Sequence, residues 1–163
     1  MNQSSSVQKI TNMSDVAPLM RDFALHGIRS IDIFSHQLNP AVYDNAELIE
    51  AISALIRRSR QSRIRVLIRN PSSLYGYDHS LLSLIQRLPS RAYIRAYSEG
   101  AKDRFFGFFC VDKKHLIYFN DEAMWQGFAR YNAQAESKHL LNEFEHLWLY
   151  GSTEDPNFRT LNI

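Results

Sequence analysis

The chain has 163 residues, of which 45% are hydrophobic and 12% aromatic, so the composition predicts a single globular domain with one sizeable core. Its formal net charge of +2 is too small to indicate nucleic-acid binding by itself. The only cysteine, Cys110, excludes an intramolecular disulfide and is compatible with a reducing compartment, so we expect a cytoplasmic protein.

The two ends of the sequence differ from its middle. Residues 1–14 are polar and rich in serine, which predicts a flexible N-terminal tail and neither a signal peptide nor a membrane anchor. Residues 15–151 carry the periodic apolar patterns and form a predicted single α/β domain. Residues 152–163 are predicted to be a C-terminal tail that packs on or near this domain through Phe158, Leu161 and Ile163.

The middle of the chain alternates between helical and extended patterns. In order, these predict a helix from Ser14 or Asp15 to Gly27, a strand over 28–35, a loop over 36–45, a helix from near Asp44 to Arg60, a strand over 63–69, a helix from Asp78 to Leu88, a strand over 91–97, a loop over 98–103, a hairpin over 104–120, a loop with a short helix over 121–130 and a helix over 136–150. This alternation favours a mixed, mostly parallel central sheet with helices on both faces.

Charged residues on three of the predicted strands could form one cluster. If the strands are neighbours in register, Asp32, Arg65 and Arg95 share one sheet face with Tyr93. One interpretation is an anion pocket, because arginine binds phosphate and carboxylate through two parallel hydrogen bonds. The other is a buried network that holds the sheet to its helices.

Arginine is also concentrated between residues 51 and 77, where no carboxylate occurs. The six are Arg57, Arg58, Arg60, Arg63, Arg65 and Arg69. The segment Arg57–Arg69 could bind phosphate or nucleic acid, with Tyr75 and Tyr77 as stacking groups. Alternatively, these cations are a solvated helix end followed by a strand, since cations are favourable at the C-terminus of a helix.

The hairpin over 104–120 consists of two aromatic strands joined by a polar turn at Asp112, Lys113 and Lys114. With the preceding strands and helices, it resembles one half of the phospholipase D superfamily. The catalytic motif of that superfamily is His-x-Lys-x4-Asp, and aligning its Asp with Asp112 puts Phe105 at the His position and Gly107 at the Lys position. Neither residue can supply a nucleophile or a cation for phosphoryl transfer.

The resemblance implies a phospholipase D-like fold and a degenerate, non-catalytic domain, that is, a pseudoenzyme. Single-motif members of that superfamily pair across a two-fold axis, so it also implies a homodimer. The chain is similar, too, to a short uncharacterised bacterial domain that occurs alone or beside acetyltransferases. We therefore expect a binding or assembly domain, with phosphate or nucleic-acid binding as the alternative. The expected partner is a second copy of the chain or another protein, and no membrane partner is expected.

Enzymes of unrelated chemistry are the remaining alternative. His36 follows a strand and His79 precedes a helix, so both are weak candidates for a site in a loop. No pair of cysteines or histidines has zinc spacing, and no glycine-rich phosphate loop occurs, so neither a metal nor a cofactor is predicted.

Overall fold

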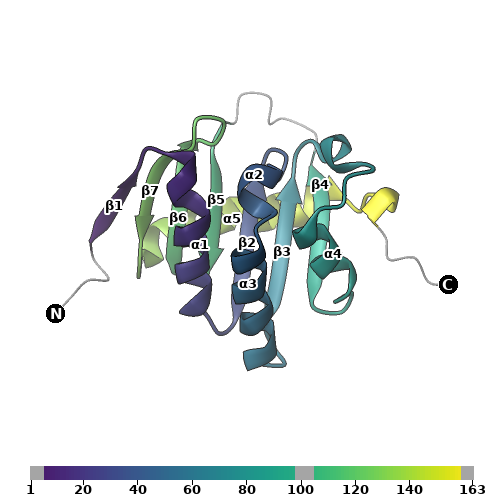
Figure 1. Cartoon of the computed structure of the whole chain (residues 1–163), viewed down its shortest axis with the longest axis horizontal. Coiled ribbons are helices and arrows are strands. Elements are labelled where there is room, and N and C mark those ends of the chain that lie inside the picture. The colour runs from purple at the N-terminus through teal and green to yellow at the C-terminus, as the bar shows by residue number, and fades with distance from the viewer. Residues whose placement is uncertain (1–5, 98–104, 159–163) are drawn as a thin grey trace.

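The computed structural model describes residues 6–97 and 105–158, and these form an α/β domain built on an eight-stranded sheet (Figure 1). The strands lie in the order β1-β7-β6-β5-β2-β3-β4-β8. Their bounds are β1 Val7–Ile10, β2 Ser30–Ser35, β3 Arg63–Ile68, β4 Ala92–Tyr97, β5 Gly107–Val111, β6 His115–Asp121, β7 Gln126–Arg130 and β8 Ser152–Thr153. The helices are α1 Val16–Leu25, α2 Pro40–Tyr43, α3 Ala46–Arg58, α4 Ser80–Gln86 and α5 Gln134–Tyr150, with 3-10 turns at Met13–Asp15, Pro71–Leu74 and Pro156–Phe158.

The predicted α/β class with a mixed sheet is confirmed, but the prediction that the sheet is mostly parallel is wrong. Among the described strands, only the β2–β3 and β3–β4 pairs are parallel, and every other pair is antiparallel. The physical reason lies in the connections. Helices link β2 to β3 and β3 to β4, and such crossovers allow parallel pairing, whereas a tight turn at Asp112 joins β5 to β6 and enforces antiparallel pairing.

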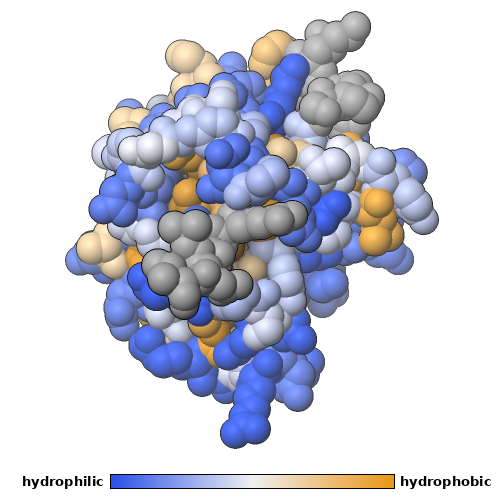
Figure 2. Space-filling view, turned by 90° about the vertical axis from the view of Figure 1, so that its right-hand side faces the viewer, coloured by the Kyte–Doolittle hydropathy of each residue, from blue (hydrophilic) through white to orange (hydrophobic). Residues whose placement is uncertain are grey.

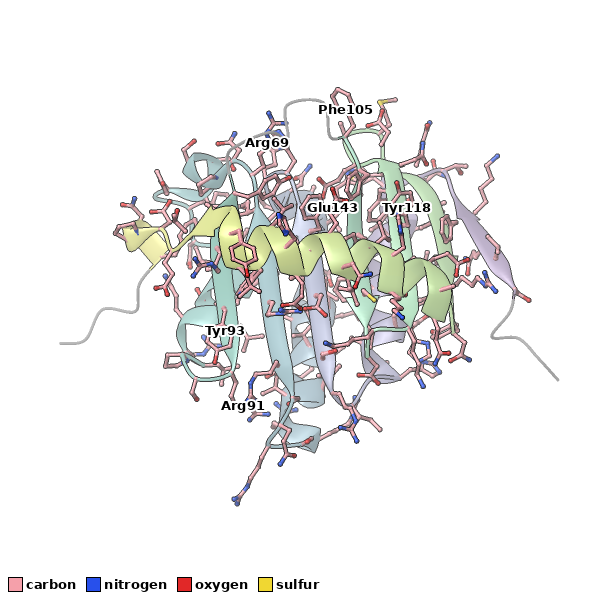
Figure 3. The ribbon with its side chains drawn as sticks, turned by 180° about the vertical axis from the view of Figure 1, so that it is seen from behind. Arg69, Arg91, Tyr93, Phe105, Tyr118 and Glu143 are labelled. Carbon is pink, nitrogen blue, oxygen red and sulfur yellow. The ribbon has the colours of Figure 1, made fainter. Side chains whose placement is uncertain are left out.

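Helices cover both faces of the sheet. Helices α1, α3 and α4 lie on one face (Figure 1), and α5 runs across the strands on the other (Figure 3). The alternation predicted for β2 is present, because Ile31 and Ile33 belong to the core under α1 and α3 while Phe34 belongs to the core under α5. Cys110 is fully buried in the second core.

Two short strands lie in segments for which the sequence predicts no strand. Val7–Ile10, within the expected tail of residues 1–14, pairs antiparallel with β7 as an edge strand and buries Ile10. Gln126–Arg130, within the expected loop over 121–130, is β7 itself. Both segments are short and weakly apolar, and they become strands because β6 offers an edge on which β7 and then β1 can pair.

Part of the C-terminal segment lies on the domain. Ser152–Thr153 pairs with the end of β4, and Phe158 is buried against the first core, so this part of the predicted C-terminal tail lies on the domain. The helix predicted to begin at Asp78 is capped by His79 instead. The loop predicted over 98–103, together with Leu161 and Ile163, lies outside the described residues.

Candidate functional site

Two of the three motif positions, Phe105 and Gly107, lie at the edge of the sheet where the parallel strands end. Strand β5 runs antiparallel to β2 with Phe34 opposite Phe108, so Gly107 at the start of β5 lies beside the carboxyl end of β2. Phe105 precedes β5 and is 68% exposed at the same edge (Figure 3). This edge is where open α/β sheets commonly bind ligands.

Gly107 is closely surrounded. A Cβ atom at this position would lie 2.9 Å from the carbonyl oxygen of Phe34 and 3.0 Å from the carboxyl carbon of Glu122. Distances this short to backbone require the structure to shift. The Lys position of the motif therefore cannot take a side chain unless its surroundings move, and a carboxyl group stands directly beside it.

Glu122 is the buried carboxyl group of this edge, and no pattern in the sequence singles it out as a site residue. It follows β6, it is 6% exposed, and Ser35 Oγ and the His36 backbone N–H each donate to it at 2.7 Å. Burial raises the pKa of Glu122 to about 7, although these two hydrogen bonds oppose the rise. A carboxylate immediately after a strand is the one signal that could have drawn attention to it.

A cavity of about 260 Å³ opens beside Glu122. His36 and Arg69 line it from the ends of β2 and β3, and Phe105 and Trp125 line it from the β5–β6–β7 side. Partial burial lowers the pKa of His36, and the nearby Arg69 lowers it further. Of the two weak histidine candidates, His36 therefore lies at this edge.

His79 has a structural role. It is buried, its Nδ1 accepts from the backbone N–H of Leu81, and its Nε2 lies 3.0 Å from the carbonyl oxygen of Leu38. A ring whose Nδ1 accepts must carry its proton on Nε2, so the neutral ring caps α4 and holds the preceding loop. Burial lowers the pKa of His79, which favours this neutral form.

Asp112, the one residue of the motif that is retained, fixes the hairpin turn. Its carboxylate accepts hydrogen bonds from the backbone N–H groups of Ile28, Arg29 and Ser30 at 2.7 to 3.1 Å. Its φ of 55° lies in the left-handed region, which aspartate tolerates better than most residues. The turn is thereby attached to the start of β2.

The predicted polar cluster on the α5 side of the sheet forms in part. Arg65 Nε donates to Asp32 Oδ1 at 2.8 Å, and the guanidinium also pairs with Glu145 of α5 at 2.8 Å. Burial raises the pKa of Asp32 although Arg65 opposes the rise. Arg65 thus connects β2, β3 and α5.

Tyr93 and Arg95 are not bonded to that ion pair. The Tyr93 hydroxyl donates to the carbonyl oxygen of Ser90, and Arg95 donates to Ser152 Oγ and pairs with Glu154. Arg65 and Arg95 do meet at the Trp148 ring, with guanidinium carbons 5.4 and 5.6 Å from its centroid. The four residues therefore share one sheet face without forming one hydrogen-bonded network.

The six arginines of the segment Arg57–Arg69 do not form a single surface. Arg57 pairs with Glu50, Arg58 donates to the carbonyl oxygens of Ala24 and Gly27, and Arg65 is bound to Asp32. Arg60 and Arg63 are exposed, while Arg69 is half-buried. The segment thus serves several structural purposes.

Comparison with known proteins places the chain in a family. A family model described as a domain of unknown function (DUF7931) matches residues 12–161. The chain belongs to this family. No curated protein matches its sequence.

The fold of this DUF7931 member occurs in solved structures of low sequence identity. TrmBL2, an archaeal chromatin protein, aligns with a TM-score of 0.62 and 10% identity over 89% of this chain and 52% of that one. Phosphatidylserine synthase of Haemophilus influenzae aligns with a TM-score of 0.59 and 11% identity, over 88% of this chain and 38% of that one. NucT from Helicobacter pylori aligns with a TM-score of 0.63 and 8% identity, over 92% of this chain and 98% of that one. The chain thus spans about half of the first protein and less of the second. The shared architecture is consistent with the predicted phospholipase D-like fold.

The described residues contain neither a cluster of metal ligands nor a membrane-spanning helix. In residues 6–97 and 105–158, no group of three or more His, Cys, Asp or Glu side chains is placed to hold a metal ion. No helix in these ranges has the length and apolar character that crossing a membrane requires.

Proposed function

We propose that this chain is a non-catalytic, phospholipase D-like binding or assembly domain, a pseudoenzyme. The observation that carries the proposal is the contact at Gly107, where a side-chain carbon would collide with the carbonyl oxygen of Phe34 and the carboxyl group of Glu122. Phosphoryl transfer by covalent attack needs a nucleophile and a cation at the phosphorus. Here the nucleophile position is a benzyl group, and a carboxyl group borders the cation position.

The electrostatics of this edge support the proposal further. Both oxygens of Glu122 accept hydrogen bonds from the end of β2, so the group is fixed in place. With a pKa of about 7, Glu122 carries negative charge in a substantial part of the molecules at neutral pH. A phosphodiester brought to Gly107 would meet that charge in a buried setting, where repulsion is stronger than in water.

The test is a phosphodiesterase assay on the purified chain. We expect no turnover above buffer with bis(p-nitrophenyl) phosphate, phosphatidylcholine vesicles or plasmid DNA, with and without Mg²⁺. Turnover that disappears in Glu122→Gln or His36→Ala, the two groups at this cavity that can exchange protons near neutral pH, would contradict the proposal and make the edge an active site of unrelated chemistry.

The assembly part of the proposal is a homodimer formed through the same edge. Phe105 and Met124 are 68% and 60% exposed. The backbone N–H of Glu122, two residues before Met124, donates to the carbonyl oxygen of Phe105, so both side chains lie at this edge. Large exposed apolar residues that gather at one edge are a feature of surfaces that another protein covers. A second copy would bury both while leaving the α5 face free.

A second candidate function is binding of phosphate or nucleic acid. Two arginines that lie close together favour it. The Arg63 backbone N–H donates to the carbonyl oxygen of Arg29 at 2.9 Å, which brings the two residues together. The archaeal chromatin protein of similar fold is described as having a novel mode of DNA binding. Affinity for DNA that falls steeply with salt would support this candidate, and an absent or salt-independent gel shift would contradict it.

A further inference from the structure

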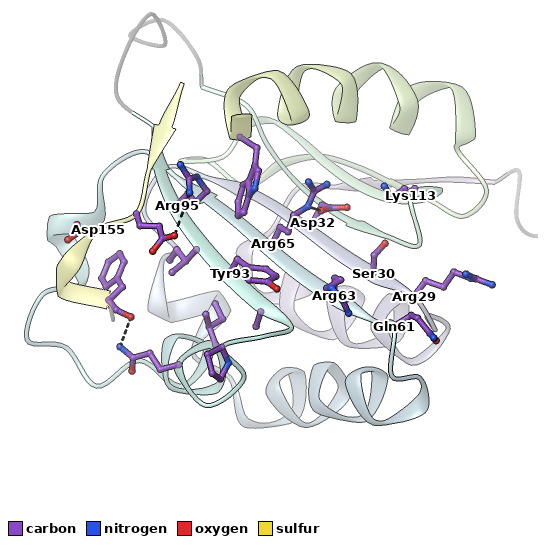
Figure 4. A pocket seen from close by; sticks show the side chains of 18 of the residues that line it. Arg29, Ser30, Asp32, Gln61, Arg63, Arg65, Tyr93, Arg95, Lys113 and Asp155 are labelled. Carbon is purple, nitrogen blue, oxygen red and sulfur yellow. Dashed lines mark hydrogen bonds and ion pairs between the residues drawn. The ribbon is translucent and has the colours of Figure 1, made fainter. Parts of the chain in front are cut away.

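Part of one sheet face lies open beside α5 (Figure 4). Helix α5 covers the upper part of this face, and below it a cleft of about 920 Å³ extends across β2, β3 and β4 (Figure 4). This volume is within the range of small-molecule sites. The cleft lies away from Phe105 and Gly107, neither of which lines it.

Three cations stand together at one end of the cleft. Arg29 precedes β2, Arg63 begins β3, and Lys113 lies in the turn between β5 and β6 (Figure 4). All three are exposed, and none forms an ion pair with a carboxylate in the part of the chain that the structure describes. The carboxylate of Asp112, at the same end, is already bound to three backbone N–H groups. This end of the cleft therefore favours an anionic group.

Asp32 lines the middle of the cleft and carries an unsatisfied acceptor. Its side chain is 2% exposed, Oδ1 accepts from Arg65, and Oδ2 has no hydrogen-bond partner among the described residues. Leaving a buried carboxylate oxygen unpaired costs free energy. A ligand that donates an O–H or N–H to Oδ2 would recover that loss.

Tyr93 forms part of the floor. It stands opposite Arg65 on the neighbouring strand, its ring lies along the sheet face, and it is 37% exposed (Figure 4). Its hydroxyl is held by Ser90, so the ring is fixed in orientation. Neighbouring strands lie about 4.8 Å apart, so Arg63 on β3 and the Tyr93 ring on β4 are within reach of one small ligand.

The lining is apolar where the cleft passes around the β4 edge toward the opposite sheet face, which carries α4. Ile85 and Pro89, at and after α4, and Phe158 of the C-terminal turn line this part. Figure 2, which views the molecule from the side that carries α4 and β4, shows hydrophobic residues exposed between hydrophilic ones on this side. The α5 face of the cleft thus offers cations, a hydrogen-bond acceptor and an aromatic ring, in that order, and apolar residues follow beyond the β4 edge.

From this order we propose that the cleft binds a nucleoside phosphate. The phosphate contacts Arg29, Arg63 and Lys113, a sugar hydroxyl or base amine donates to Asp32 Oδ2, and the base stacks on Tyr93. The inference rests on the proposed binding function and names its ligand. An anionic lipid would satisfy the cations and the apolar end, but its acyl chain would leave Asp32 Oδ2 unpaired. A carboxylate that binds a ribose hydroxyl is an established use of aspartate in nucleotide sites of other folds.

The test is calorimetric titration of the full chain with AMP, adenosine, ribose 5-phosphate and inorganic phosphate at low ionic strength. We expect AMP to bind at least about tenfold more tightly than each of the other three, because only AMP engages all parts of the cleft. Equal affinity for inorganic phosphate and AMP, or no saturable binding of AMP, would overturn the proposal. Tighter binding of dihexanoyl phosphatidic acid than of AMP would overturn it in favour of a lipid.

Matched variants separate the contacts. We expect Arg63→Gln and Lys113→Gln each to weaken AMP binding about tenfold and to leave adenosine binding unchanged. The controls are Arg60→Gln, at an exposed cation, and Lys114→Gln, at a half-buried one. Both lie outside the cleft, so both should leave the binding of AMP and of adenosine unchanged. Tyr93→Leu should weaken AMP but not ribose 5-phosphate, and Tyr93→Phe should retain binding. If a control variant weakened AMP binding as much as its counterpart in the cleft, the effect would come from the overall charge of the protein, and the proposed site would be wrong.

Asp32→Asn tests the unsatisfied oxygen. The variant keeps an acceptor for Arg65 and can place an amide donor where Oδ2 stood, so adenosine and AMP should both bind more weakly. The melting temperature of Asp32→Asn, compared with that of the wild type, shows whether the variant folds. If it does not fold, Tyr93→Leu tests the same site at an exposed residue. Unchanged affinity in a folded Asp32→Asn protein would contradict the assigned hydrogen bond.

Two additional arms identify the source of the ligand and keep this proposal separate from the first. A 5′-phosphorylated oligonucleotide that AMP displaces would support the site and identify a strand end as a natural source, whereas one that AMP does not displace would contradict it. Chromatography of the ligand after titration shows whether it is intact. Cleaved ligand would contradict the non-catalytic function while leaving the binding result valid.

Discussion

Arg65 reaches across two parallel strands to Asp32, with Nε and Oδ1 2.8 Å apart, and its other side binds Glu145 of α5. The guanidinium also lies over the Phe144 ring at 4.9 Å from its centroid. One side chain thus joins β2 and β3 to the helix that covers them. Because Asp32 is buried, its charge depends on Arg65 for compensation.

Replacing Arg65 by methionine should therefore destabilise the fold strongly. Removing one partner of a buried ion pair leaves an uncompensated charge, and we expect Arg65→Met to lower the free energy of unfolding by about 3–5 kcal/mol. Urea unfolding at pH 7 measures it. Arg57→Met is the matched control, since its pair with Glu50 is exposed and should contribute less than about 1 kcal/mol. Equal losses in the two variants would show that the Arg65 network is not structural.

Glu122 should make the stability depend on pH. Its pKa is about 7 in the folded protein and 4.5 as the ordinary value, so the folded state binds more protons than the unfolded state between these pH values. The free energy of unfolding contributed by this group therefore falls as pH rises from about 4.5 to 7, by roughly 3 kcal/mol in total. Above pH 7 the contribution stays constant.

The variant Glu122→Gln isolates this effect. Glutamine resembles the protonated carboxyl group and does not titrate, so we expect equal stabilities near pH 4.5 and a more stable variant at pH 8. His36, His79 and His115 have lowered pKa values and contribute with the opposite sign, but they are present in both proteins, so the difference between the two stability curves removes them. A difference that does not change with pH would mean that Glu122 has an ordinary pKa.

Gly107→Ala tests the close packing at the degenerate motif. The added methyl would lie 2.9 Å from the carbonyl oxygen of Phe34, and overpacking against backbone typically costs about 1–3 kcal/mol. Gly151→Ala is the control, because its Cβ would meet only the end of the flexible Leu147 side chain and the backbone at ordinary distance. Thermal unfolding of both variants checks the difference. If Gly107→Ala did not change the melting temperature, the Lys position of the motif would have room for a side chain.

The proposed dimer makes a prediction about mass. Light scattering should give twice 19.0 kDa for the wild type, and Phe105→Asp or Met124→Asp should shift the equilibrium toward the monomer, because charge at the centre of an apolar contact opposes association. Leu25→Asp, at a 49% exposed residue that ends α1 near the start of β2 and so lies at the opposite edge, should leave the mass unchanged. A wild type that is monomeric at high concentration would contradict the assembly proposal.

Local patterns predicted the elements whose own sequence determines them. The apolar stripe with Leu48, Ile52 and Leu55 gave α3, and the aromatic strands gave β5 and β6 with their turn at Asp112. Strands β1 and β7 could not be predicted in this way, because their extended conformation depends on pairing with a neighbour. The prediction of mostly parallel pairing is wrong because turns join β5 to β6 and β6 to β7, and such short connections impose antiparallel pairing.

The candidate site was harder to predict because its members are far apart in sequence. Ser35 and Glu122 are 87 residues apart and meet only after the sheet has formed. Asp32 and Arg65 were predicted together because both lie on regular strands whose register can be guessed from alternation. The partners of Arg95 come from the C-terminal segment, whose position on the domain no local pattern indicates.

Cys110 should be unreactive in the folded protein. It is fully buried, and burial raises the pKa of its thiol to about 12, against a partial offset from Ser137. At pH 8 only about one molecule in ten thousand would carry the thiolate, which is the reactive form. We expect Ellman's reagent to modify one thiol per chain in urea and essentially none in native buffer, whereas an added exposed thiol in Lys138→Cys should react at once. Full labelling of the wild type within minutes in native buffer would show that β5 opens readily and that the sheet core beside Gly107 is not closed.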